Sequence, residues 1–278
     1  MVTLSVLMDT LLVILLSCCC ACFAEGDTAP SQKPYIPRQH PKWTDWREAL
    51  AHALGNKTPQ EPEKIGEGVW LHAEVMYNVA FYNESTWWKQ QTENHSVTKK
   101  DLMKRYFEDL FKELQTYFHN QSIMVNIKVE SVSEIDNLIA IYESQKFINA
   151  TATLINIQNH GMAQGKSNDT VFYLFTWPDN TRNQKRLLDH IRTPGPHRSG
   201  VPDVATNGTF CTGETSAALI RHRIGSGIFW ATARATTSVF GSSHFMVFPE
   251  KDREKMQKTF SQCPSQNEDG QTFDVLQC

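Results

Sequence analysis

The sequence predicts an α/β sandwich built on a twisted, mainly parallel sheet. Three observations lead to this prediction: an alternating strand pattern near residue 70, a long helical pattern after it, and an uninterrupted apolar strand near residue 173. The intervening segments complete the order strand, helix, strand, helix, strand, which is typical of a parallel sheet with helical crossovers. The chain has 278 residues, 40% hydrophobic and 21% charged, which is enough for one large core. A net charge of −3 gives no reason to expect nucleic acid.

The first part of the predicted domain begins near Gly68. Apolar residues alternate over 69–79, which predicts a strand, and a polar loop follows. Residues 98–119 carry apolar side chains at helical spacing with Lys and Glu between them, which predicts a long amphipathic helix packed on the core. Alternation returns at 123–129 and predicts a second strand.

The second part begins with a predicted helix at 143–157. The continuous apolar run at 170–176 is typical of a strand buried on both faces. Residues 177–200 are predicted to form a polar insertion that contains a short helix at 183–192, and extended segments are predicted at 203–211 and 216–224. A helix at 227–240 is expected to end at Gly241, and a last helix at 251–260 lies in a small C-terminal subdomain.

The N-terminal segment has the pattern of a secretory signal peptide. Residues 2–24 are almost entirely apolar and end in small residues before Glu25, so cleavage is expected after Ala24. Because no basic residue precedes the apolar core and Asp9 interrupts it, a membrane anchor is the alternative. The uninterrupted run is shorter than the ~20 residues of a spanning helix, which favours the signal peptide.

Between the signal peptide and the domain, residues 25–67 form a proline-rich linker or the remnant of a pro-segment. Within it, residues 43–54 could form a short helix that docks on the domain, or remain a partly ordered tail. We therefore expect three parts: 1–24, 25–67 and a domain at 68–278.

Glycosylation triplets give independent support for secretion. The chain has seven Asn-x-Ser/Thr triplets, where chance would place about two in this composition. The triplet at Asn56 is the weakest, because Pro59 follows it closely. The predicted glycosylation sites are Asn83, Asn94, Asn120, Asn149, Asn168 and Asn207.

Cysteine usage predicts one disulfide. Four of the seven cysteines lie in the predicted signal peptide, so the mature chain keeps Cys211, Cys263 and Cys278. One bridge and one remaining thiol are expected in an oxidising compartment. Spacing alone does not choose between the three possible pairs.

Several short motifs in the last third of the chain resemble the catalytic domain of reprolysin-like metzincin proteases, and with them the domain resembles a metzincin sandwich. Asn207–Cys211 resembles the Gly-x-x-Cys that precedes the edge strand of that family, and Ser216–Ile220 resembles this edge strand. Ser226–Ala231 resembles the start of the family's active-site helix. Phe260–Cys263 resembles the family's Phe-Ser-x-Cys, and Met246 could be a relic of its Met-turn. The chain also resembles the secreted salivary 28-kDa family of metastriate ticks, which is similar to tick reprolysins.

The zinc motif of metzincins is degenerate in this chain. The motif reads His-Glu-x-x-His-x-x-Gly-x-x-His on a helix that ends at the glycine. Gly241 and His244 stand at the last two fixed positions, but Arg234, Ala235 and Ser238 replace the two helical histidines and the glutamate. An arginine has no lone pair for a metal, and an alanine cannot act as a base. We therefore expect no catalytic residues, no metal ligands and no cofactor, zinc included.

The resemblance also implies a disulfide. In reprolysins the Gly-x-x-Cys cysteine is bridged to the last cysteine of the domain, which implies a Cys211–Cys278 bond here and leaves Cys263 unpaired.

Three functions follow from these observations. The first is a secreted, glycosylated pseudoprotease that binds an extracellular or host protein as a monomer, without nucleic acid or membrane contact. The second is an active secreted zinc metallopeptidase with a divergent metal site, and the third is a binding module unrelated to metzincins. The first is preferred because no register of the 227–240 helix gives a histidine pair.

Overall fold

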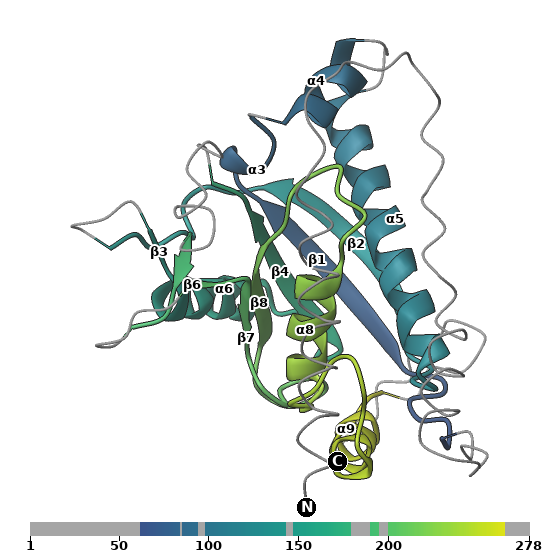
Figure 1. Ribbon diagram of the computed structural model, residues 1–278. Helices are drawn as coiled ribbons and strands as arrows, with labels where there is room; N and C mark the ends of the chain where they lie inside the picture. Colours follow the sequence, from purple (N-terminus) through teal and green to yellow (C-terminus); the bar gives the residue numbers. More distant parts are fainter. Residues whose placement is uncertain are drawn as a thin grey trace, which may run out of the picture. The chain divides into compact units, whose positions relative to one another are not determined.

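The computed structural model describes residues 62–83, 85–93, 98–142, 147–178, 190–194 and 200–264, all within the unit Pro41–Cys278. It is a mixed α/β structure with a mainly parallel central sheet, as predicted (Figure 1). The predicted signal peptide and most of the predicted linker lie outside these residues. In the described part of the chain, no helix is long and apolar enough to span a membrane.

The central sheet has five strands in the order β2-β1-β4-β8-β7. β1 pairs in parallel with β2 and β4, β4 pairs in parallel with β8, and β7 pairs antiparallel with β8. The strands are β1 (Trp70–Tyr77), β2 (Asn126–Glu134), β4 (Thr170–Thr176), β7 (Asp203–Ala205) and β8 (Ser216–Arg221).

The predicted boundaries near β1 and β2 shift by a few residues. Ile65 is buried and forms a parallel bridge with Ile123, so the domain includes residues that the sequence assigned to the linker. The segment after β1 is not only a polar loop, because it holds the short helices α3 (Ala80–Asn83) and α4 (Thr86–Glu93).

Helix α5 (Lys99–Asn120) confirms the strongest helical prediction of the chain. The Thr98 hydroxyl accepts a hydrogen bond from the Asp101 amide and caps its N-terminus. One stripe of the helix is buried against the sheet: Met103, Phe107, Leu110, Phe111, Leu114, Tyr117 and Phe118. Each such side chain contributes about 1.5–3 kcal/mol by leaving water, so apolar burial is the main contribution that holds this helix on the sheet.

Helix α6 (Ala150–Gln164) lies on the opposite face of the sheet and begins seven residues later than predicted (Figure 1). Ile148 belongs to a strand because it pairs with Ile191 in a small second sheet. The Asn149 side chain then caps the helix by accepting from the Ala152 amide. The second sheet has the order β3-β5-β6, with β3 (Ile148–Asn149), β5 (Ile191–Arg192) and β6 (Gly200–Val201).

The structure contradicts two predictions for the region between β4 and α8. Ser216–Ile220 is not an edge strand, because β8 lies inside the sheet between β4 and β7, and the edge is the short strand β7. The predicted short helix at 183–192 is contradicted at its end, where Ile191 and Arg192 form β5; residues 183–189 lie outside the described residues.

Helices α8 (Trp230–Val239) and α9 (Glu250–Phe260) follow β8. Phe260 of α9 packs against Phe210 and Phe240, with ring centroids 6.3 Å and 5.0 Å apart. This packing brings the residues after α9 next to the loop after β7.

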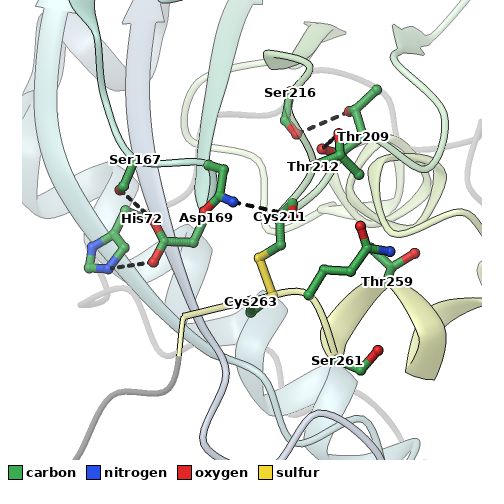
Figure 2. Close-up of a disulfide and its surroundings, with 12 residues drawn as sticks. His72, Ser167, Asp169, Thr209, Cys211, Thr212, Ser216, Thr259, Ser261 and Cys263 are labelled. Carbon is green, nitrogen blue, oxygen red and sulfur yellow. Dashed lines mark hydrogen bonds and ion pairs between the residues drawn. A yellow bond between two sulfur atoms is a disulfide. The ribbon is translucent and has the colours of Figure 1, made fainter. Parts of the chain in front are cut away.

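The disulfide joins Cys211 to Cys263, so the expected Cys211–Cys278 bond is wrong (Figure 2). The Cα atoms are 4.8 Å apart, within the usual range for a bridge. The physical reason is the docking of α9, which fixes Cys263 three residues after Phe260 beside Cys211. Cys278 lies outside the described residues.

Candidate functional site

Two of the degenerate motif positions, Arg234 and Ser238, lie at a groove between β7 and α8. Arg234 and Ser238 are one helical turn apart and share a face of α8, as their spacing predicts. With the edge strand they line a pocket of about 270 Å³. Its lining residues are Asp203, Val204, Ala205, Asn207, Arg234, Thr237, Ser238, Ser242 and Ser243.

An ion pair occupies this groove. Arg234 Nε lies 2.9 Å and 3.1 Å from the two carboxylate oxygens of Asp203, and its Nη2 lies 2.8 Å from Oδ1. The Arg234 side chain is 41% exposed, whereas that of Asp203 is 6% exposed. Burial raises the pKa of Asp203, and the hydrogen bond and charge of Arg234 oppose that rise. The charge of Arg221 also opposes the rise, but Arg234 is the cation that forms hydrogen bonds with this buried carboxylate.

The other two replaced positions have structural contacts. Ala235 is completely buried in the core cluster that α8 shares with α5, so its side chain does not face the groove. The Ser238 hydroxyl donates to the Thr206 carbonyl at 3.2 Å. Both residues hold α8 against the sheet.

Gly241 ends α8 in a conformation that favours glycine. Its φ is +92°, and a Cβ built there would lie 3.5 Å from the Cα of Gly208. Gly208 itself has a φ of +65°, and its amide donates to the Ser238 carbonyl at 2.9 Å. The loop after β7 is thereby fixed to the C-terminus of α8.

His244 does not join Arg234 and Ser238 in the pocket lining. Its Nδ1 lies 2.7 Å from Oδ2 of Asp252, the third residue of α9, and its side chain is 57% exposed. Asp252 also accepts from the Ser242 hydroxyl and the Ser243 amide, at 2.9 Å and 3.1 Å. Burial alone would raise the pKa of Asp252, but these three donors lower it to about 2.

This cluster is not a nucleophile triad. The hydroxyls of Ser242 and Ser243 both donate to Asp252, and the Ser243 hydroxyl lies 3.4 Å from Nδ1 of His244. A serine nucleophile needs its hydroxyl on a ring nitrogen that is free to take the proton, with the carboxylate on the other nitrogen. Instead, Asp252 orients the loop between α8 and α9.

The described residues contain no group of three or more His, Cys, Asp or Glu side chains arranged to hold a metal ion. His222, which the sequence places between two arginines, is buried and hydrogen-bonded to the Tyr106 hydroxyl. Burial lowers the pKa of His222 to about 4, so the ring is neutral at pH 7.

A second hollow of about 570 Å³ lies where α6, the start of β4 and the Cys211 loop meet. Asn168, Thr212 and Gln262 are among its lining residues. The Asn168 side chain donates to the carbonyl of Cys211, one of the two disulfide cysteines, at 3.3 Å. On the other side of this loop, the Asp169 carboxylate accepts from Ser167 and lies 3.6 Å from His72 Nε2.

Sequence reasoning missed the two carboxylates of the site. Asp203 and Asp252 lie 31 residues before Arg234 and 8 residues after His244. The available signal was indirect: a half-buried arginine on a helix needs an acidic partner.

The side chains of the predicted glycosylation asparagines differ in exposure to solvent. Asn120, Asn168 and Asn207 are exposed, Asn149 is partly buried, and nothing is described of the Asn83 side chain. Asn94 lies outside the described residues.

Comparisons with known proteins report a weak likeness to solved structures. No protein-family model matches the chain, and no curated protein matches it. Among solved structures, the chain is similar to metalloproteinase-II from Bacteroides fragilis, with a TM-score of 0.38 and 9% sequence identity. The match covers 76% of this chain and 60% of that protein. It is a likeness to a metalloproteinase and defines no family for this chain.

Proposed function

We propose that the chain is a secreted, glycosylated, metalloprotease-like protein that binds an extracellular protein without cleaving it. The observation that supports it best is the Arg234–Asp203 ion pair, which stands where the degenerate motif would have its first zinc ligand. A permanent cation at that point repels a metal ion and has no lone pair to offer it.

The neighbouring contacts support the same proposal. Hydrolysis by a zinc protease needs three ligands, an open fourth position and a carboxylate that takes a proton from the bound water. Here Ala235 is buried, Ser238 is bonded to the backbone of the β7 loop, and His244 is bonded to Asp252.

The proposal extends to the class of partner. The resemblance to the secreted salivary family of metastriate ticks suggests a host protein of haemostasis or immunity. This step is an analogy between families, because fold and motif history do not determine a binding partner.

A cleavage assay separates this function from an active, divergent metallopeptidase. The secreted protein, incubated with a mixed peptide library and zinc, is expected to generate no cleavage that a chelator suppresses. Chelator-sensitive cleavage that disappears in H244A and changes in R234A would overturn the proposal. Cleavage that both variants leave unchanged identifies a contaminating protease, and the purified protein is then retested.

A further inference from the structure

The sequon asparagine Asn207 lies at the groove that replaces the zinc site. It belongs to the triplet Asn207-Gly208-Thr209 on the loop between β7 and β8. The Gly208 amide donates to the Ser238 carbonyl at 2.9 Å, and the Phe210 amide donates to the Val239 carbonyl at 3.2 Å. These bonds fix the loop on α8, so Asn207 has a defined place beside the pocket.

The Asn207 side chain is available for modification. The side chain is exposed, and its Oδ1 and Nδ2 form no hydrogen bond with any residue that the structure describes. Two other sequon asparagines are engaged: Asn149 Oδ1 caps α6, and Asn168 Nδ2 donates to the Cys211 carbonyl. In the described part of the chain, Asn207 differs from both in having no hydrogen-bond partner for its side-chain amide.

The pocket beside Asn207 has the chemistry of a sugar site. Its lining carries the hydroxyls of Thr237, Ser238, Ser242 and Ser243 and the guanidinium of Arg234. The ion pair uses Nε and Nη2 of Arg234, which leaves further N–H donors on a half-exposed group. A volume of about 270 Å³ is below the usual range for drug-sized ligands and suits a single sugar ring.

We infer that the first N-acetylglucosamine of a glycan on Asn207 folds back into this pocket and covers the Arg234–Asp203 ion pair. The inference rests on the proposed secretion of the chain. Sugar hydroxyls and the acetamide carbonyl accept from the guanidinium, and sugar hydroxyls donate to the serine oxygens, whose own hydrogens are used within the protein. The groove is then closed by the protein's own glycan, and a protein partner binds elsewhere on the surface.

The modification follows ordinary secretory chemistry. A lipid-pyrophosphate-linked oligosaccharide is the donor: a bond forms between Asn207 Nδ2 and the sugar C1, the C1–O bond to the pyrophosphate breaks, and Nδ2 loses a proton. The Thr209 hydroxyl of the triplet is buried and bonded to Thr206 and Ser216 at 2.7 Å and 3.0 Å. Transfer therefore precedes closure of this loop, on the nascent chain.

Asn120 provides the matched control. It is the last residue of α5, is exposed, and lies in neither of the two hollows described above. A glycan there is placed at neither of these two hollows.

The test measures the rate at which peptide-N-glycosidase releases each glycan from the native secreted protein. Release in ¹⁸O water labels each former site, and mass spectrometry of the peptides follows the sites separately. We expect release at Asn207 at least tenfold slower than at Asn120, and equal rates after denaturation. In R234A, release at Asn207 should accelerate while release at Asn120 is unchanged, and a circular dichroism spectrum matching the wild type checks that the variant remains folded.

Each other outcome overturns the inference. Equal native rates at the two sites, or an occupied Asn120 with a vacant Asn207, contradict it while leaving secretion intact. If none of the sequons is occupied in a glycosylating host, the proposed secretion of a glycoprotein fails, and this inference fails with it.

Discussion

Helices α5 and α8 lie on the same face of the sheet, yet they are held there in different ways (Figure 1). α5 buries seven large aromatic and aliphatic side chains. α8 buries small or hydroxyl-bearing residues: Thr232, Ala233, Ala235, Thr236, Thr237 and Val239. Ala233, Ala235 and Val239 pack in the core cluster, and polar contacts such as the Arg234–Asp203 ion pair add to this packing. The two helices therefore differ in the size of the side chains by which they pack on the sheet.

The largest effect is expected on the α5 side. Phe107 is completely buried; it stacks on Phe81 with ring centroids 5.6 Å apart and packs at a tilt against Phe175 with ring centroids 4.8 Å apart. F107A should lower the free energy of unfolding by about 3–5 kcal/mol, because it removes a large buried ring and leaves a cavity. Denaturant unfolding measures this loss. K104A, on the exposed face of the same helix, should change it by less than about 0.5 kcal/mol.

The next effect is a pH dependence from His222, the buried polar group between α5 and the end of β8. Its pKa in the folded chain is about 4, below the ordinary value of 6.5. The unfolded chain therefore binds this proton first, so stability is fully present above pH 6.5 and falls as the pH drops towards 4. The loss is on the order of 2–3 kcal/mol.

H222Q tests this assignment. The glutamine can still bond to Tyr106 but does not titrate, so the acid loss should shrink. Part of it should remain, because burial also lowers the pKa of His190 to about 4, with Arg221 adding to the shift. An unchanged pH profile in H222Q would contradict the assignment.

On the α8 side, R234A should lower the free energy of unfolding by about 1–3 kcal/mol. The reason is that it leaves the Asp203 carboxylate buried without its cation, and partial exposure of Arg234 reduces the cost below that of a fully buried pair. A double-mutant cycle with D203N measures the coupling. A stabilised R234A would show that the ion pair has no structural role.

The smallest effect is expected from the bond between α8 and β4. The Tyr173 hydroxyl lies 3.0 Å from the Thr236 hydroxyl, and both residues are buried. Y173F should cost about 0.5–1.5 kcal/mol, because Thr236 keeps its bond to the Thr232 carbonyl. A loss as large as that of F107A would contradict the distinction between the two helices.

The sequence predicted those elements whose patterns are local. α5 and β4 were correct because a helical stripe and an apolar run are read from neighbouring residues. α6 was misplaced because Ile148 pairs with Ile191, a long-range contact that leaves no local pattern. The same limit explains the site: Arg234 and Ser238 share a face by their spacing, whereas Asp203, Asp252 and the partner of Cys211 come from distant segments.

The most direct test of the central claim is the zinc content of the protein. The secreted wild-type chain is dialysed against buffer after exposure to excess zinc, and metal per chain is measured by mass spectrometry of the elements. The account predicts far less than one equivalent, because Arg234, Ala235 and Ser238 provide no ligands. One tightly bound zinc per chain, lost in H244A, would contradict it.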